Sequence, residues 1–377
     1  MSEPILGESL AELRATRSSL KWRIYGADVL PVWVAEMDAR PCQAVVDEVA
    51  TAMRRGDTGY PWSEPYVEAM AAFAQRRWGW TFRAADTWLV PDVMIGIAEL
   101  IRLMTDQGGP VVVSPPVYNA FYGFIEAVRR QVVEAPLDEA GRLDLDALEA
   151  AFGSVAGERA TYLLCNPHNP TGTVPTAEEL TALSLLAHQF GVQVISDEIH
   201  APLVQPDVAF TPYLSVAEAG IAVASASKAW NLAALKGALV IAGEADRPTL
   251  RRLHEVHTHG ASQLGMIAQT AAYSQGEQWL DQVLAELADN ARLLDDLLSE
   301  RLPRVRFQPP QATYLGWLDC RELGLGDDPA AVFRERGKVA LASGLEYGAA
   351  GAGFARFNFA TSAEVITEAV ARMAAAV

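Results

Sequence analysis

Three short polar segments of this sequence carry side chains that could hold a ligand or take part in catalysis. They are NPHNPTG (166–172), DEIH (197–200) and SASKAWNLAALKG (225–237), and each follows a short apolar run. In open α/β sheets, ligands bind at the carboxyl ends of the strands. We therefore expect the segments to meet at one sheet edge and to form a site from Asn166, His168, Asn169, Asp197, His200, Ser225, Ser227, Lys228 and Lys236.

Lys228 is the side chain with the clearest chemical use. It stands among Ser, Ala and Trp directly after the apolar run 221–224. A lysine that has lost its water has a lowered pKa, and its free amine is a nucleophile. Taken singly, each segment has a simpler interpretation, because Asn-Pro pairs initiate turns, acids at strand ends cap helices and lysines are usually solvated. The occurrence of all three segments in one chain favours a site.

The elements that must position these segments form an alternation of strands and helices. Short β-branched or apolar runs predict strands at 111–113, 161–165, 192–196, 221–224 and 238–242. A capping box from Thr176 to Glu179 predicts a helix that ends at Gly191, and Asp144 caps another helix. Strand, helix and strand at this spacing predict a mostly parallel sheet covered by helices.

The pattern changes after about residue 275. A long helical stretch (277–302) is followed by strand candidates at 313–318 and 356–359, and a second capping box, Thr361 to Glu364, predicts a final helix. This mixture indicates a smaller α+β domain. We expect a large domain over 46–275 and a small domain built from 1–45 and 276–377.

Composition narrows the range of partners. The 377 residues carry a formal net charge of −17, which argues against a nucleic-acid partner because phosphate contacts need a basic surface. No apolar run reaches membrane-spanning length, and the first residues lack the apolar segment typical of a signal peptide. We expect a cytoplasmic protein with no membrane partner.

Neither the histidines nor the cysteines indicate a metal site. His254, His257 and His259 cluster, but they have no acidic or cysteine partner at ligand spacing, so a surface helix and no metal are expected. Three cysteines are scattered along the chain without a CxxC pair, and we expect reduced, buried thiols: Cys42, Cys165 and Cys320.

The sequence resembles a known enzyme family at several motifs. These are SSLKW (18–22), VWVAEMDA (32–39), CNPHNPTG (165–172), DEIHAPL (197–203) and SASKAWNLAALKG (225–237). In this order they resemble the fold-type I pyridoxal 5′-phosphate (PLP) enzymes of the class I/II aminotransferase superfamily, and within it the MalY/PatB-type cystathionine β-lyases. The resemblance covers nearly the whole chain. It implies an α/β fold, with a mostly parallel seven-stranded sheet flanked by helices in the large domain, a smaller α+β domain, and a homodimer.

The resemblance also implies roles for the matching residues around the cofactor. Lys228 would hold PLP as a Schiff base and then move the Cα proton of an amino-acid substrate. Asp197 would pair with the protonated pyridine nitrogen, which keeps the ring an electron sink. Asn169 would bind the O3′ oxygen with support from His200, and Tyr118 would stack on the ring beside the reacting atoms.

The phosphate and the substrate would occupy two further parts of the same site. The phosphate would lie at the start of a helix beginning near Gly96 and Ile97, where free amides favour an anion. Its other contacts would come from Ser225, Ser227, Lys236 and, across a subunit interface, Tyr60. Arg356 would clamp the substrate α-carboxylate with two parallel hydrogen bonds, and Asn169 and Ala35 would also contact the substrate.

The residues themselves leave the reaction open, because loss of the Cα proton is common to transamination and α,β-elimination. The resemblance favours a carbon–sulfur β-lyase, with an aminotransferase as the alternative and a catalytically idle PLP-binding protein as a third hypothesis. Three departures from the family pattern concern the substrate, one of which is a looser loop (341–353) before Arg356. Glu36 stands where the pattern has Asp, and Ala39 stands where an aromatic residue is usual.

Overall fold

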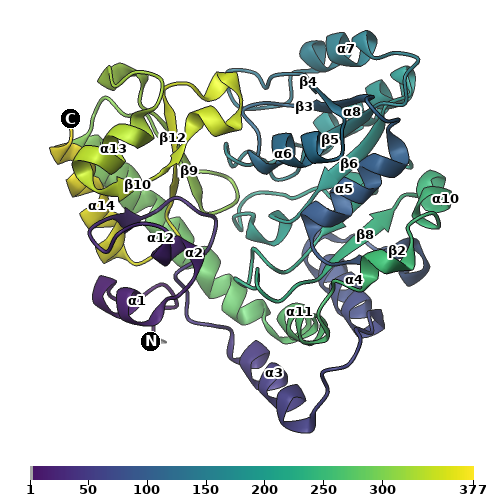
Figure 1. The fold of residues 1–377 in the computed structure, drawn as a ribbon, viewed down its shortest axis with the longest axis horizontal. Helices are drawn as coiled ribbons and strands as arrows, with labels where there is room; N and C mark the ends of the chain where they lie inside the picture. Colours follow the sequence, from purple (N-terminus) through teal and green to yellow (C-terminus); the bar gives the residue numbers. More distant parts are fainter. Residues whose placement is uncertain (1–2) are drawn as a thin grey trace.

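A seven-stranded sheet forms the centre of the larger lobe in the computed structural model, which describes residues 3–377 (Figure 1). The strand order is β2-β8-β7-β6-β5-β3-β4. The strands are β2 (Thr87–Val90), β3 (Pro110–Val113), β4 (Gln131–Glu134), β5 (Thr161–Cys165), β6 (Gln193–Asp197), β7 (Ile221–Ala224) and β8 (Ala238–Ala242). Only β8 runs against the others. The predicted mostly parallel seven-stranded sheet is confirmed.

Both faces of this sheet are buried under helices, as the near-continuous apolar strands require. Alternate residues of β3 show this, because Val111 and Val113 face one core cluster and Val112 faces another. The first cluster includes α5 (Val93–Met104) and α6 (Ala120–Ala127). The second includes α7 (Leu145–Ser154), α8 (Ala177–Phe190) and α9 (Tyr213–Val216). At the β8 end, α11 (Gln263–Gln275) packs on α3 (Gln43–Arg55) and α4 (Glu64–Trp78), and α10 spans Arg247–Leu250.

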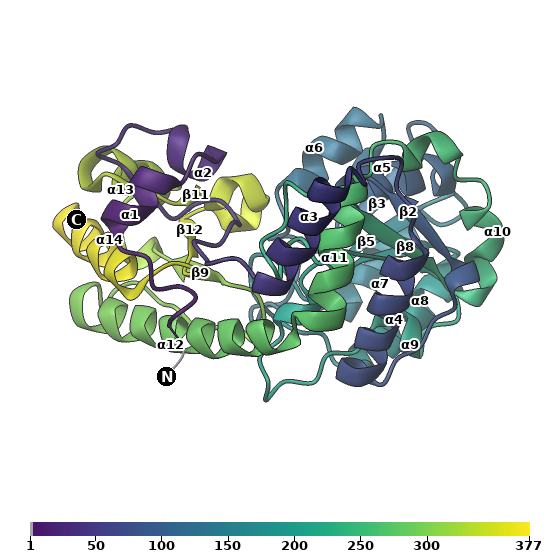
Figure 2. The same cartoon turned by 90° about the horizontal axis from the view of Figure 1, so that it is seen from below.

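A smaller lobe is built on the long helix α12 (Glu277–Arg301), which extends from the larger lobe along one side of the smaller one (Figure 2). It contains an antiparallel sheet of β11 (Ala342–Ser343), β12 (Phe354–Asn358) and β9 (Leu315–Asp319), together with α13 (Pro329–Gly337) and α14 (Ala363–Ala375). The N-terminal segment supplies α1 (Leu10–Thr16), α2 (Leu20–Arg23) and β1 (Leu30–Pro31). Because β1 pairs in parallel with β10 (Val339–Ala340), both ends of the chain lie in this lobe. We propose the division at residues 45 and 275 on this basis.

Several predicted helix ends are confirmed, and the predicted cap at the start of the final helix is wrong. Thr176 and Glu179 form the capping box of α8, which ends at Gly191 with a φ of 70°. Asp144 caps α7. The final helix begins at Ala363 after Ser362, and no Thr361–Glu364 box forms. The Glu364 carboxylate instead accepts a hydrogen bond from the Leu10 amide, so a contact with α1 replaces the local one.

Within residues 3–377, no helix combines the length and the apolar composition needed to cross a membrane. The longest of these helices, α12, has one buried face, which includes Leu280, Leu287 and Leu294.

Candidate active site

The carboxyl ends of β5, β6 and β7 bring the three polar segments to one edge of the sheet. The parallel registers place Cys165 beside Asp197 and Asp197 beside Val223. Because β8 runs in the opposite direction, Lys236 lies just before its start at the same edge. Lys228 interacts electrostatically with both Asp197 and Lys236. The predicted convergence is therefore confirmed, whereas the roles of the residues stay predictions.

Lys228 is partly accessible to solvent but surrounded by protein. Burial, together with the positive charge of Arg356, lowers the pKa of its amine to about 8, while the negative charges of Asp197 and Glu36 act in the opposite direction. The amine Nζ donates a hydrogen bond to the Ala35 carbonyl oxygen at 2.9 Å. A substantial fraction of the amine is thus neutral near pH 8, as a nucleophile requires.

Asp197 and His200 lie in the same dry environment. Burial raises the pKa of Asp197 to about 7, although a hydrogen bond from the Ile199 amide and the charge of Lys228 favour the ionised form. Burial lowers the pKa of His200 to about 3, with the charges of Lys228 and Arg356 adding to the effect. The imidazole is therefore neutral, and its Nδ1 has no hydrogen-bond partner.

Arg356 and Asn169 meet although they are far apart in sequence. Arg356 Nη1 donates to Asn169 Oδ1 at 3.1 Å, and Nη2 donates to the Trp33 carbonyl oxygen at 2.9 Å. The guanidinium lies 5.1 Å from the centre of the Tyr347 ring, and its Nε has no partner. Among residues 3–377 this buried cation forms no ion pair, so it is available to an anionic ligand.

The expected phosphate-binding helix begins one turn earlier than predicted. Asp92 caps α5 through a hydrogen bond from the Ile95 amide, and Val93 is the first helical residue. The Gly96 amide already donates to the Asp92 carbonyl oxygen. A Cβ on Gly96 would lie 2.8 Å from a Val90 methyl group, so Gly96 belongs to the core with Ile97. The prediction for Gly96 and Ile97 as the helix start is wrong, because Asp92 was not recognised as the cap; the first amides without intrahelical partners belong to Val93 and Met94.

Lys236, Ser225 and Ser227 were predicted to bind the phosphate, and they differ in their contacts and exposure. Lys236 Nζ is 2.8 Å from Asp92 Oδ2, at the N-cap of α5. The Ser225 hydroxyl is buried between the Gly237 carbonyl oxygen and the Gln269 side chain, at 2.8 and 3.0 Å. Ser227 is partly exposed. Lys236 is thus paired with Asp92 and Ser225 makes internal hydrogen bonds, whereas Ser227 is partly exposed and could contact an anion directly.

The two predicted tyrosines differ in position. Tyr118 is near both Arg356 and Asp197, whose charges act on a hydroxyl whose pKa is raised mainly by burial. Tyr60 is 87% exposed, and its ring lies 6.4 Å from that of His259. A single chain therefore leaves Tyr60 in solvent.

Comparison with known proteins identifies the family. The family model described as aminotransferase class I and II matches residues 30–373. The chain belongs to the aminotransferase class I and II family. A Mycobacterium tuberculosis protein provisionally named a cystathionine beta-lyase is 49% identical over 395 residues, covering 98% of this chain and 97% of that protein. The cystathionine beta-lyase PatB of Bacillus subtilis is 32% identical over 381 residues, covering 97% and 98%.

A solved structure confirms the fold of the family member. The crystal structure of a protein from Corynebacterium diphtheriae, provisionally described as a PLP-dependent beta-cystathionase, superposes with a TM-score of 0.93 at 38% identity. The match covers 99% of each chain. The predicted fold-type I PLP-dependent transferase fold and the resemblance to the MalY/PatB group are both confirmed.

The donor set of this family member fits PLP. A buried carboxyl group at Asp197, an unpartnered Nδ1 on His200 and a desolvated amine on Lys228 lie together. These groups match a protonated ring nitrogen, a ring oxygen and an aldehyde. The free amides at the start of α5 match a phosphate. PLP is therefore the cofactor to be expected in this site.

Sequence reasoning missed the side chains that hold the segment 33–38 against Lys228. Lys21 and Asp38 form an ion pair at 2.7 Å, with both side chains fully buried. Trp22 Nε1 donates to the other oxygen of Asp38 at 2.8 Å. The motifs SSLKW and VWVAEMDA were used only to recognise the family. They also supply the two partners of a buried ion pair, which was not predicted from the sequence.

Three more side chains fix the backbone of this segment. Asn231 binds the amide and the carbonyl oxygen of Met37 at 3.0 and 2.9 Å. Asn358 Nδ2 donates to the carbonyl oxygens of Val34 and Glu36. The Tyr314 hydroxyl donates to the same Ala35 carbonyl oxygen as Lys228, at 3.1 Å. The segment is held by residues from both lobes.

Gln269 of α11 is a further missed residue, and it braces the loop 225–237. It is fully buried. Its Oε1 accepts hydrogen bonds from the Tyr66 hydroxyl and the Ala226 amide at 2.8 and 3.0 Å, and its Nε2 donates to the Gly237 carbonyl oxygen at 2.7 Å. Nothing local in the sequence marks this glutamine.

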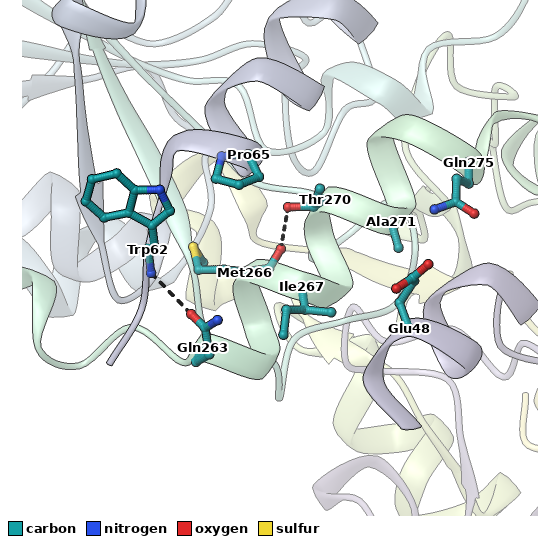
Figure 3. A pocket seen from close by; sticks show the side chains of 9 residues that line it. All are labelled: Glu48, Trp62, Pro65, Gln263, Met266, Ile267, Thr270, Ala271 and Gln275. Carbon is teal, nitrogen blue, oxygen red and sulfur yellow. Dashed lines mark hydrogen bonds between the residues drawn. The ribbon is translucent and has the colours of Figure 1, made fainter. Parts of the chain in front are cut away.

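A cavity of about 320 Å³ lies between α3, α4 and α11, and Lys228 does not line it (Figure 3). Its lining is Glu48, Trp62, Pro65, Gln263, Met266, Ile267, Thr270, Ala271 and Gln275. Trp62 is 68% exposed, and its amide donates to Gln263 at 3.2 Å. None of the lining residues is a predicted site residue.

The histidine cluster lies outside the site, whereas the Cys165 sulfur accepts a hydrogen bond from the Asn169 amide at 3.4 Å. His254 Nδ1 accepts a hydrogen bond from the Val256 amide in a short 3₁₀ turn, and His257 lies 3.4 Å from Glu99. Within residues 3–377, no group of three or more His, Cys, Asp or Glu is placed to hold a metal ion. The three cysteines are buried and unpaired, as predicted.

Proposed function

We propose that this protein is a PLP-dependent carbon–sulfur β-lyase. It cleaves cystathionine, or a related cysteine S-conjugate, to a thiol, pyruvate and ammonia. The observation that carries the proposal is the combination around Lys228: a desolvated amine, a buried carboxyl at Asp197 and the unpaired guanidinium of Arg356. The names of the relatives from Mycobacterium tuberculosis and Bacillus subtilis support the choice of reaction.

The residues would hold the cofactor at three points. Lys228 would bind it covalently, Asp197 would face the ring nitrogen, and the amides of Val93 and Met94 would receive the phosphate. Asn169, His200 and Tyr118 would surround the ring. When bound, PLP supplies an electron sink for the negative charge that develops at the substrate Cα.

The substrate would be oriented by the small lobe and deprotonated by the large one. Arg356 binds the α-carboxylate through its two Nη atoms, assisted by Asn169, and so presents the Cα–H bond to Lys228. With a pKa near 8, the Lys228 amine can take up the Cα proton and release it again close to neutral pH. The Ala35 carbonyl oxygen, which accepts from Lys228 Nζ, helps to direct the amine.

The atoms and electrons of the elimination balance without any oxidant. The Cα–H bond and the Cβ–S bond break, a Cα–Cβ double bond forms, and the sulfur leaves with the electron pair and is protonated to a thiol. The remaining three-carbon fragment takes up water and yields pyruvate and ammonia. An aminotransferase remains the alternative, because the same residues would also serve transamination, which needs a keto-acid acceptor.

We also propose that the protein works in the cytoplasm as a homodimer, with Tyr60 reaching the phosphate of its partner. Three findings support the dimer: the ring of Tyr60 and that of Trp62 are 87% and 68% exposed, and the adjoining cavity is lined largely by apolar side chains (Figure 3). Exposed aromatic residues beside an apolar recess are typical of interfaces. The unpaired, buried cysteines fit a reducing compartment.

The proposal is tested by incubating the purified holoenzyme with L-cystathionine in the absence of any keto acid. We expect pyruvate and a free thiol in equal amounts, and neither product from the Lys228→Ala variant. Consumption of cystathionine only when a keto acid is added, with no pyruvate released, would establish the aminotransferase instead.

A further inference from the structure

Glu36 is a charged residue near Lys228 to which the proposed function assigns no ligand group. Asp197 is assigned to the ring nitrogen, Lys236 to the phosphate and Arg356 to the substrate α-carboxylate. The fourth, Glu36, acts on Lys228 through its negative charge and on the Tyr314 hydroxyl in the same way. Among residues 3–377, no lysine, arginine or histidine forms an ion pair with Glu36, and its carboxylate accepts a hydrogen bond only from the neutral Ser19 hydroxyl.

Glu36 is the neighbour in the chain of a residue that contacts Lys228. It directly follows Ala35, whose carbonyl oxygen accepts the hydrogen bond from Lys228 Nζ at 2.9 Å, and consecutive Cα atoms are only about 3.8 Å apart. The residue is half-buried, so its charge is less screened than a fully exposed one while it can still be reached from solvent.

The backbone of Glu36 is fixed from three sides. Its carbonyl oxygen accepts hydrogen bonds from Lys21 Nζ at 3.1 Å and from Asn358 Nδ2 at 2.7 Å. Its amide donates to the Val34 carbonyl oxygen at 2.8 Å. With Ser19 holding the side chain, the carboxylate is oriented before any ligand binds, which lowers the entropic cost of pairing with one.

We propose that Glu36 selects cysteine S-conjugates whose leaving thiol carries a cationic group. The ammonium of the leaving portion pairs with the Glu36 carboxylate while Arg356 holds the α-carboxylate at the other end. The leaving portion of cystathionine is a zwitterion, so its ammonium would pair with Glu36 while its carboxylate points away. The inference rests on the proposed β-lyase function and extends it to the choice of substrate.

Two nearly isosteric substrates test this selection in the holoenzyme. S-(2-aminoethyl)-L-cysteine and S-propyl-L-cysteine differ in placing an ammonium or a methyl group at the end of the same chain. We expect kcat/KM for pyruvate release to favour the aminoethyl compound by roughly three- to tenfold, as a partly screened ion pair provides. The Glu36→Gln variant should bring this ratio close to one, and it should improve the relative use of S-(2-carboxyethyl)-L-cysteine.

The control removes an equal charge elsewhere. Glu300 is exposed in the last turn of α12, so Glu300→Gln should leave the ratio of the two substrates as in the wild type. A wild-type ratio of about one, or a ratio that Glu36→Gln does not change, would overturn the selection by Glu36 while leaving the lyase intact. Absence of pyruvate from all three conjugates while L-cystathionine is still cleaved would also overturn the selection by Glu36. Absence of pyruvate from L-cystathionine as well would overturn the proposed function and this inference with it.

Discussion

At the scale of single residues, the carboxyl group of Asp197 is buried away from water. Burial raises the pKa of Asp197 from its ordinary 3.8 to about 7, so the folded chain favours the protonated form. The corresponding contribution to stability is fully present below about pH 4 and is lost as the pH rises through about 7. Without a cofactor, the ionised carboxylate is therefore a cost to the fold above neutral pH.

We expect Asp197→Asn to stabilise the cofactor-free protein at pH 8 by roughly 1–3 kcal/mol, because the amide carries no charge to desolvate. The gain should shrink toward pH 4, and the variant should bind PLP weakly. Urea unfolding of the cofactor-free proteins at both pH values measures this, with Asp207→Asn, at an exposed position, as the matched control. A variant less stable than wild type at pH 8 would show that Asp197 already has an adequate partner in the chain.

Arg356 offers a second test at this scale. Its two Nη atoms donate to Asn169 and Trp33, which fixes the guanidinium for a carboxylate. Arg356→Ala should lower kcat/KM roughly 100-fold, chiefly through KM, because two charge-assisted hydrogen bonds are lost. The visible absorption of the bound cofactor should persist. An unchanged KM would remove Arg356 from substrate binding.

At the scale of elements, the segment 33–38 depends on the buried ion pair of Lys21 and Asp38. Lys21→Met should destabilise the protein by about 3–5 kcal/mol, because Asp38 is left as an unpaired buried charge. Adding Asp38→Leu should recover much of that loss, since no charge then remains buried. Chemical unfolding of both variants measures the difference, and equal stabilities would show that the pair is not the source of the effect.

The sequence predicts local elements better than distant contacts. Strands β5, β6 and β7 follow from buried apolar runs, and α8 from its capping box and Gly191. The start of α5 was misplaced, because Asp92 caps it without a recognisable box. Strand β4 (QVVE), at the sheet edge, has exposed ends and a weak apolar pattern. Contacts such as Asn231 with Met37 join residues about two hundred positions apart, and no local spacing reveals them.

At the scale of the whole molecule, the chain forms two lobes (Figure 2), and the site is built from contacts between them. Lys228 and Asp197 come from the larger lobe, whereas Arg356 and Ala35 come from the smaller. The hydrogen bond from Lys228 to Ala35 therefore joins the lobes directly. Catalytic geometry depends on how the lobes sit against each other, and local strand and helix patterns do not determine that arrangement.

The proposed homodimer is testable by mixing two inactive variants. Tyr60→Ala chains lack the phosphate contact and Lys228→Ala chains lack the amine. A mixed dimer would contain one intact site if Tyr60 reaches the partner's phosphate, so unfolding and refolding the mixture should restore about a quarter of wild-type activity. Each variant refolded alone is the control, and no recovery in proven mixed dimers would place Tyr60 outside the partner's site.

The most direct measurement is chemical trapping of the cofactor on its lysine. The chain contains only four lysines, Lys21, Lys228, Lys236 and Lys338, so peptide mapping after borohydride reduction of the holoenzyme distinguishes them all. We predict the cofactor mass on Lys228 alone, with no visible absorption band in Lys228→Ala. Attachment at another lysine, or a band that survives in Lys228→Ala, would contradict the assignment of the site.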